Sequence, residues 1–259
     1  MLSLAAIRRR LPGWLALARR EIGPIALVLL VGACLLLFRH IADEVGEGDT
    51  RAFDRAIIFA LRTPGNPHRP IGPDWLNTAA VDVTSLGSTT VLGIIVILVA
   101  GLFLSFRRWR EAAALLLASG GGLVITDLLK DWFQRDRPPQ ALHVVQAINA
   151  SFPSGHATLS ATVFLTLGAL IAHFAERRRV RVYALAAAVI LSAMVGCSRV
   201  YLGVHWPTDV LGGWCLGSAW ALIWWGAAIV WERITHRRLS TGPVRHLQPE
   251  DGALLSEGG

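Results

Sequence analysis

Three short stretches of the sequence bring cations, histidines and a carboxylate together at fixed spacings. They read KDWFQRDRP over residues 130–138, PSGH over residues 153–156 and SRVYLGVHWPTD over residues 198–209. The first stretch begins with Lys130, the only lysine in a chain that has 25 lysine and arginine residues. Because all the others are arginines, a lysine at this one position indicates a specific chemical task.

The cations in these stretches predict a binding site for a phosphate ester. Lys130, Arg137 and Arg199 carry positive charges close to apolar segments, where unpaired charge usually marks a function or a partner. Asp209 is the obvious carboxylate available to them. The other carboxylates, which would neutralise part of the remaining surplus, are Asp127, Asp131 and Asp136. A phosphate would complete the balance, because guanidinium groups fork onto two phosphate oxygens and an ammonium group acts as a compact point charge.

The stretch PSGH predicts that backbone groups also bind the phosphate. It directly precedes an apolar run, and a helix that begins here turns free N–H groups and its positive dipole end toward the loop. Gly155 permits close approach of an anion to the backbone, and Ser154 adds a hydroxyl donor. A helix N-terminus of this kind is a natural phosphate site.

The two histidines of the motif stretches suit nucleophilic and acid–base roles. His205 stands four residues before Asp209, and a carboxylate bonded to one ring nitrogen leaves the other nitrogen free as a nucleophile. Pro207 suits the first turn of a helix, which places His205 just before that helix. His156 can serve as general acid for a departing alkoxide and then as base for water.

Apolar segments long enough to cross a bilayer surround these stretches. The chain is 53% hydrophobic and 17% charged, whereas a soluble domain carries about 25% charged residues. The expected spans are Ile22–Phe38, Leu86–Phe106, Ala112–Leu129, Ala157–Ala175, Val182–Cys197 and Val210–Trp231. The sequence therefore predicts an all-α polytopic membrane protein, with a six-helix bundle as its one domain over residues 22–238. We expect a basic interfacial segment over residues 1–21 and a disordered tail over residues 239–259.

The arginines predict which ends of these spans lie together. With six spans, four arginine-rich segments fall on one side, and such segments are typical of the cytoplasmic face. They contain Arg8, Arg9, Arg10, Arg19 and Arg20, then Arg107, Arg108 and Arg110, then Arg177, Arg178, Arg179 and Arg181, and finally Arg233, Arg237 and Arg238. Both termini are then cytoplasmic, and all three motif stretches lie on the periplasmic or extracellular face of the plasma (inner) membrane. The net charge of +7 reflects this asymmetry and anionic headgroups, not nucleic acid.

The outward-facing region before the second span contains an expected surface helix. Over Thr50–Arg62 apolar residues recur at helical spacing with charged residues between them, which is typical of an amphipathic helix on the membrane surface. We expect its arginines, Arg51, Arg55 and Arg62, to lie among headgroups, with contact to the second phosphate of a diphosphate substrate as the alternative. In the first motif stretch, a helix that continued through Arg137 would place Lys130 and Arg137 on one face.

Together and in this order, the three stretches resemble the three-part signature of the type 2 phosphatidic acid phosphatase superfamily. All positions of lysine, six residues, Arg-Pro, then Pro-Ser-Gly-His, then Ser-Arg, five residues, His, three residues, Asp match in identity and spacing. The motifs cover residues 130–209, and the six-span layout extends the resemblance to most of the chain. Soluble vanadium haloperoxidases share the signature, but six spans argue against that branch.

The resemblance implies a metal-independent lipid phosphate phosphatase that uses no cofactor and forms a phosphohistidine intermediate. Carried over by position, His205 attacks phosphorus, Asp209 orients His205, and His156 protonates the leaving oxygen. The phosphate-binding residues that the resemblance implies are Lys130, Arg137, Ser154, Gly155 and Arg199. No residue is expected to bind a metal.

The substrate expected from this reading is an amphiphile of the bilayer with a terminal phosphate. Polyprenyl diphosphate, phosphatidylglycerophosphate and phosphatidate all fit, and the compact connection between Pro138 and Pro153 favours undecaprenyl diphosphate. One alternative is a lipid phosphotransferase, in which a hydroxyl group captures the phosphohistidine. A more distant alternative is a transporter or anion-binding protein that uses the cationic site without chemistry.

Overall fold

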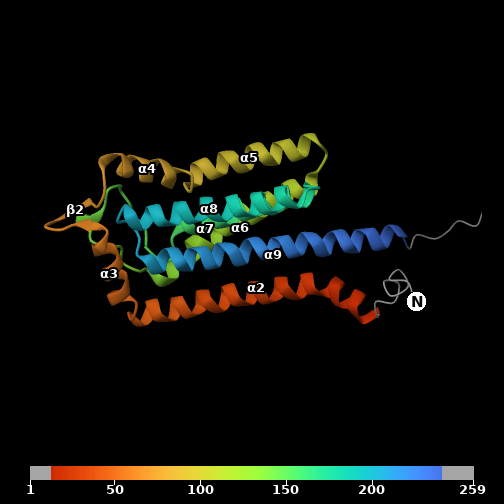
Figure 1. Cartoon of the computed structure of the whole chain (residues 1–259), viewed down its shortest axis with the longest axis horizontal. Coiled ribbons are helices and arrows are strands. Elements are labelled where there is room, and N and C mark those ends of the chain that lie inside the picture. The colour runs from red at the N-terminus through yellow and green to blue at the C-terminus, as the bar shows by residue number, and fades with distance from the viewer. Residues whose placement is uncertain (1–12, 241–259) are drawn as a thin grey trace, which may run out of the picture.

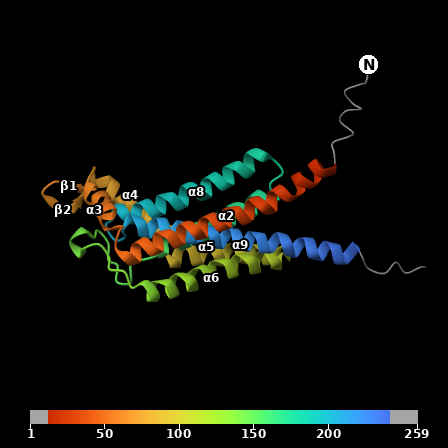
Figure 2. The same cartoon turned by 90° about the horizontal axis from the view of Figure 1, so that it is seen from below.

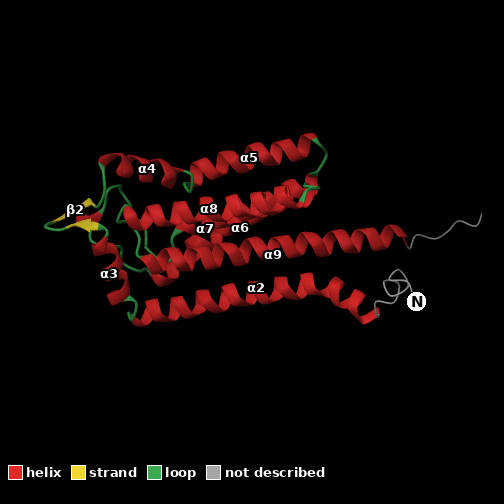
Figure 3. Ribbon diagram, viewed as in Figure 1, coloured by secondary structure: helices red, strands yellow, loops and turns green. Residues whose placement is uncertain are grey.

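The fold is a bundle of long helices with a cap of short elements at one end. The computed structural model describes residues 13–240, and it is almost entirely helical (Figures 1 and 3). The predicted segments at the two ends of the chain lie partly outside this range, at residues 1–12 and 241–259. Figure 2 shows the same bundle turned by 90°.

The long helices confirm the predicted all-α membrane bundle. They are α2 (Gly13–Glu47), α5 (Thr89–Ser105), α6 (Trp109–Phe133), α7 (Gly155–Phe174), α8 (Arg178–Tyr201) and α9 (Pro207–Ser240). In the described part of the chain, five helices are long and apolar enough to cross a membrane by themselves. A sixth span results if α4 (Asp74–Ser85) and α5, which meet at an angle of 48°, form one broken span. Each predicted span overlaps one of the long helices.

The cap contains elements that the sequence did not predict. After α3 (Arg51–Ala60) the chain forms a small antiparallel hairpin of β1 (Arg62–Thr63) and β2 (Asn66–Pro70), in which Arg62 pairs with Pro70 and Thr63 with Asn66. Helix α4 follows directly after Pro73, which caps its N-terminus. A 3-10 turn, η1 (Gln140–Leu142), lies in the connection between α6 and α7. The region before the second span is therefore folded rather than an open loop.

Helix α3 is present where an amphipathic helix was predicted, and it runs across the end of the bundle (Figure 1). It buries Ile58 and also the carboxylate of Asp54. Its location at a membrane surface stays a prediction. One expectation for this region is wrong, because Arg62 is buried and donates to the backbone oxygens of Leu61, Tyr201 and Leu142 at 3.0–3.1 Å. Strand β1 turns this guanidinium inward, away from any headgroup.

Helix α7 lies at the centre and packs against α5, α6, α8 and α9. More than half of its most apolar stretch is buried. Helix α9 approaches it closely through two glycines: a Cβ atom placed on Gly213 would lie 2.8 Å from the backbone oxygen of Ser154, and one placed on Gly217 would lie 2.4 Å from that of Thr158. Small residues thus allow close contact between the two helices, as is usual in membrane bundles.

The three motif stretches meet at the capped end of the bundle. The connections after α6 and α8 lie there together with α3 and the hairpin, while the connections after α5 and α7 lie at the other end (Figure 1). In one detail the prediction is wrong, because α6 ends at Phe133 and Gln134 has a left-handed conformation with φ of 43°. Arg137 therefore extends from a loop and does not share a helical face with Lys130.

Candidate active site

His205 and Asp209 form a buried pair at the start of α9. Both side chains are almost completely inaccessible to solvent, and Nδ1 of His205 lies 3.4 Å from Oδ2 of Asp209. The same carboxylate oxygen accepts a hydrogen bond from the backbone N–H of Trp206 at 2.8 Å and another from the hydroxyl of Ser151. Because Pro207 begins the helix, His205 precedes it, as the sequence predicted. Asp209 is thus fixed from several directions and orients the imidazole.

Arg137 contacts the opposite nitrogen of the same ring. Its Nη1 lies 3.2 Å from Nε2 of His205, and the guanidinium is held by the backbone oxygens of Val204 and Asn149 at 2.7 and 2.5 Å. A guanidinium group can only donate, so Nε2 must accept, and Nδ1 then carries the proton that points to Asp209. The two contacts assign the same tautomer, in which Nε2 is unprotonated and its lone pair faces Arg137 on the cationic side of the site.

The environment keeps this imidazole neutral. Burial lowers the pKa of His205 to about 3, and the positive charges of Arg137 and Arg199 act in the same direction against the opposing effect of Asp209. Burial likewise lowers the pKa of Arg137, although the charge of Asp209 counteracts it. A neutral imidazole with an unprotonated Nε2 is the form that can act as a nucleophile.

The start of α7 forms a side of the site that suits an anion. Ser154 caps the helix, and a Cβ atom placed on Gly155 would lie 3.7 Å from Nζ of Lys130, so the ammonium group sits beside the first turn. The hydroxyl of Ser154 and Nε of Arg199 are buried without a partner among the described residues, while Nη1 of Arg199 donates to Thr84 at 3.0 Å. Buried donors of this kind are usually satisfied, and a phosphate oxygen is a partner that both can use.

His156 completes the set of predicted residues. It is the second residue of α7 and lies against the bend between α4 and α5, where a Cβ atom on Gly87 would be 3.3 Å from its ring. It is close enough to interact electrostatically with all four of Arg199, His205, Lys130 and Arg137. Lys130 in turn interacts with Arg137, Arg199 and Asp209. Every predicted site residue is therefore brought to one place.

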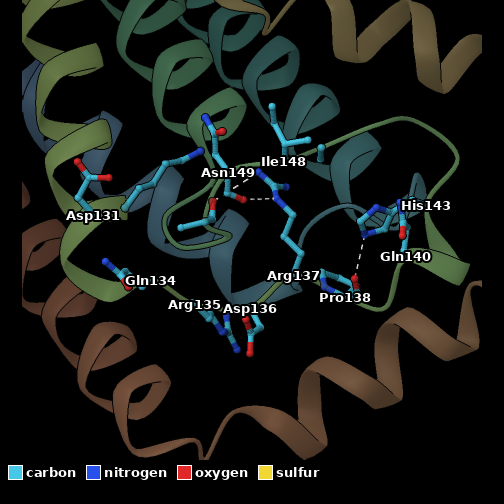
Figure 4. Close-up of a pocket in the computed structure, with 13 residues that line it drawn as sticks. Asp131, Gln134, Arg135, Asp136, Arg137, Pro138, Gln140, His143, Ile148 and Asn149 are labelled. Atoms are coloured by element: carbon cyan, nitrogen blue, oxygen red, sulfur yellow. Dashed lines mark hydrogen bonds between the residues drawn. The ribbon is translucent and has the colours of Figure 1, made fainter.

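Two cavities open beside this centre, and the loop that follows α6 lines both of them. The first has a volume of about 600 Å³ and is lined by Lys130, Arg137, His143 and Asn149 among others (Figure 4). In it, the ring of His143 is bonded to the backbone oxygen of Pro138 at 2.9 Å. The second has a volume of about 650 Å³, and its lining includes Arg51, Arg55, Phe59, Phe133 and Trp206. Arg137 lines both cavities, so each reaches the cationic centre.

Three residues that contact Asp209 or its neighbour were not predicted. They are Ser151 and Arg135, which donate to Asp209, and Asp54, which binds both Arg135 and Thr208. Ser151 and Arg135 lie within or beside the motif stretches, and their polarity was a weak signal that they belong to the site. Asp54 lies in α3, far away in the sequence, and no spacing rule connects it to Asp209.

Comparisons with known proteins show the family to which the chain belongs. The sequence model of the PAP2 superfamily matches residues 111–233. Phosphatidylglycerophosphatase B of Bacillus subtilis is 39% identical over 186 residues, which cover 70% of this chain and 86% of that protein. An undecaprenyl-diphosphatase of Sulfolobus acidocaldarius is 34% identical over 157 residues, covering 58% of this chain and 66% of that protein.

A solved structure supports the same assignment. The crystal structure of a transmembrane PAP2 type phosphatidylglycerolphosphate phosphatase from Bacillus subtilis superposes with a TM-score of 0.70 at 30% identity. The match covers 77% of this chain and 96% of that one. The resemblance seen in the three motif stretches is thereby confirmed over most of the fold, and the chain belongs to the PAP2 superfamily.

Proposed function

We propose that the chain hydrolyses the terminal phosphate of a membrane lipid through a phosphohistidine on His205, without a metal ion. The family and the named relatives make the chain a membrane lipid phosphatase and a phosphoric monoester hydrolase. The mechanism, the site residues and the choice of lipid are the proposal. The observation that carries it is the neutral His205 ring, with Nδ1 directed to Asp209 and Nε2 directed to the cations.

In the first step the phosphate binds between the cations and the start of α7. Its non-bridging oxygens are held by the cationic groups of Lys130, Arg137 and Arg199, by the hydroxyl of Ser154 and by the free N–H groups after Gly155. Nε2 of His205 attacks phosphorus and forms the N–P bond, while the P–O bond to the lipid breaks. His156 gives a proton to the leaving oxygen, and Asp209 stabilises the positive charge that develops on His205.

In the second step water replaces the histidine. His156, now deprotonated, accepts a proton from the water, whose oxygen attacks phosphorus as the N–P bond breaks. Inorganic phosphate leaves and His205 returns to its neutral form. Three cationic side chains and a helix dipole supply the charge stabilisation that a metal ion supplies in other phosphatases, which supports the metal-independent form of the proposal.

Among the candidate lipids we place phosphatidylglycerophosphate first. The relative that is matched over 86% of its own length is named phosphatidylglycerophosphatase B. The solved structure described above is also that of a phosphatidylglycerolphosphate phosphatase. Undecaprenyl diphosphate, which the compact sequence favoured, is supported by the archaeal relative. Phosphatidate is the third candidate. A substrate panel of these three lipids decides the order.

The experiment measures phosphate release from this panel by the full chain, purified in detergent with excess chelator. Wild type is expected to hydrolyse at least one lipid, and His205→Ala to lose activity by about 1000-fold or more, because the nucleophile is gone. A brief reaction with lipid labelled in its terminal phosphate should leave an acid-labile, alkali-stable label on the protein. Phosphate release by wild type no faster than by His205→Ala would overturn the proposal that the chain is an enzyme. A strict requirement for added metal would overturn the metal-independent mechanism. Less free phosphate and more phosphorylated product on adding a lipid alcohol would favour the phosphotransferase.

A further inference from the structure

A single guanidinium group, that of Arg135, bridges two buried carboxylates beneath the site. Its Nη1 donates to Oδ1 of Asp209 at 2.5 Å, and its Nη2 donates to Oδ2 of Asp54 at 2.7 Å. Both carboxylates are buried, with 1% or less of their surface exposed. The backbone oxygen of Arg135 also accepts from the N–H of Ser151, whose hydroxyl donates to Asp209. Arg135 therefore contacts Asp209 both directly and through a second residue.

Asp54 is the far end of this bridge and comes from α3. Beyond Arg135, its carboxylate accepts from the backbone N–H of Thr208 at 3.0 Å and from the Thr208 hydroxyl at 2.8 Å. Thr208 immediately precedes Asp209 in the first turn of α9. Thr50 lies just before α3, and its hydroxyl oxygen accepts a hydrogen bond at 2.9 Å from Nη2 of Arg135, the nitrogen that also donates to Asp54. The cap is thus bonded both to the guanidinium that orients Asp209 and to the backbone next to it.

The side chains of Arg135 and Arg137, the two arginines of the first motif stretch, point in different directions. Both residues line the cavity of Figure 4, but Arg137 extends toward Asn149, whereas the side chain of Arg135 extends in another direction. Residues two apart in an extended segment place their side chains on the same face, so the loop must bend between them to achieve this. Arg137 can therefore contact a bound phosphate, whereas Arg135 contacts the carboxylates of Asp209 and Asp54.

The charges of this bridge suit a reaction that makes the nucleophile positive. Asp54 and Asp209 together carry two negative charges and Arg135 carries one positive charge, so the group retains one negative charge next to His205. Formation of the N–P bond leaves a positive imidazolium ring, which this net negative charge stabilises. Removal of one partner from a buried ion pair leaves an uncompensated charge and changes the geometry of the others.

We propose that Asp54 and Arg135 are positioning residues of the phosphatase: Arg135 orients Asp209, and thereby His205, and Asp54 fixes Arg135. The inference rests on the proposed function and extends it to α3, which makes the cap part of the catalytic framework. Neither residue touches the phosphate. The effect therefore falls on the rate of phosphoryl transfer to His205 and leaves the binding of the lipid unchanged.

The test compares Asp54→Asn, Arg135→Lys and their combination with wild type on the same lipid panel. Each single variant should lower kcat by about 10- to 100-fold with KM within about threefold, because the network around a reacting group has effects of this size. Rapid-quench measurement of the labelled phosphohistidine should show its formation slowed by the same factor. The double variant should be no more than about threefold slower than the slower single variant, because both act through one bridge.

The exposed ion pair of Arg69 and Asp74 at the same end of the bundle, 3.2 Å apart, provides the matched control. Arg69→Gln should keep kcat within about twofold, since exposed pairs contribute little. If wild type and this control release no phosphate, the proposed function fails. If both release phosphate, the results for Asp54→Asn and Arg135→Lys test the inference alone. A folded Asp54→Asn protein with wild-type kcat would overturn the inference, and so would a lower kcat with unchanged phosphohistidine formation. If Asp54→Asn does not fold, Arg135→Lys decides by the same criteria.

Discussion

Among single residues, His205 shows how the surroundings select one chemical form. Asp209 contacts Nδ1 and Arg137 contacts Nε2, and only one tautomer satisfies both. Burial favours the uncharged ring. The residue thus has the proton on the correct nitrogen before any substrate binds. In the proposed reaction, little free energy is needed to prepare the nucleophile.

The lowered pKa of His205 predicts that the folded protein loses stability as pH falls. Below pH 6.5 the unfolded chain binds a proton on this imidazole that the folded chain does not bind until about pH 3. The free energy of unfolding should therefore fall by about 1.4 kcal/mol per pH unit in this window from His205 alone. Thermal unfolding in detergent between pH 7.5 and 4.5 measures this, with His205→Gln as the control. The wild-type midpoint should fall more steeply, and parallel curves for the two proteins would contradict the prediction.

The position of Lys130 predicts that its replacement by arginine, which conserves the charge, lowers the activity. Nζ of Lys130 lies beside Gly155, in a site that already contains the guanidinium groups of Arg137 and Arg199. A third planar fork does not fit there as the compact ammonium does, so Lys130→Arg should lower kcat/KM at least about tenfold, or about 1.4 kcal/mol. Steady-state kinetics checks this, with the exposed Arg69→Lys as the control. Activity near wild type would make Lys130 an ordinary helix-end anchor.

The sequence predicted the residues that meet at the candidate site, but not the residues that support them. His205, Asp209 and Arg199 stand at fixed spacings, and such spacing is visible in one sequence. Asp54 lies outside every motif stretch, and its carboxylate was expected on the polar side of a surface helix. Its contact with Arg135 depends on how α3 lies across the bundle. Local periodicity carries no information on that arrangement.

For whole elements, the close contact of α7 and α9 is set by glycines. A methyl group on Gly217 would come within 2.4 Å of the backbone oxygen of Thr158, and a backbone atom cannot move aside as a side chain can. Gly217→Ala should therefore destabilise the protein by about 1–3 kcal/mol, the usual cost of overpacking. Thermal unfolding in detergent measures this. Gly120→Ala in α6 is the control, because nothing lies within 4 Å of its added methyl group. A Gly217→Ala protein as stable as the control would contradict this packing.

The long helices were predictable, whereas several of their ends were not. Apolar length identified each span, but it marks only the part suited to the bilayer. Helix α2 continues past Phe38 to Glu47 through polar residues, where Arg39 and Asp43 form an ion pair one turn apart at 3.6 Å. Helix α4 is short, and its N-terminus follows a Pro- and Gly-rich segment, so it was not recognised. These features depend on packing in the cap rather than on hydropathy.

At the scale of the whole molecule, the arginine-rich connections and the candidate site lie at opposite ends. The exposed arginines of the connections after α5 and α7 are at one end, and the candidate site is at the other (Figure 1). We propose from this distribution that the arginine-rich end is cytoplasmic and that the site faces the outside of the plasma membrane.

Cysteine labelling in intact cells tests this orientation. In a background without Cys34, Cys197 and Cys215, a cysteine at the highly exposed Ile148 should react with an impermeant maleimide from outside. A cysteine at Arg178 should react only after the cells are opened. The opposite pattern would place the site in the cytoplasm and overturn the proposed orientation.

The bond from the backbone N–H of Ser154 to the backbone oxygen of Asp209, 3.0 Å long, has a consequence for how this enzyme can be redesigned. It joins the proposed phosphate-binding turn to the partner of the proposed nucleophile through main-chain atoms, and Gly213 allows close contact of the two helices. The cavity walls, by contrast, also contain side chains outside the reacting centre, such as Arg55 on α3 and Asn149 in a loop. These two wall residues can therefore be exchanged to admit a different headgroup while the reacting centre keeps its geometry.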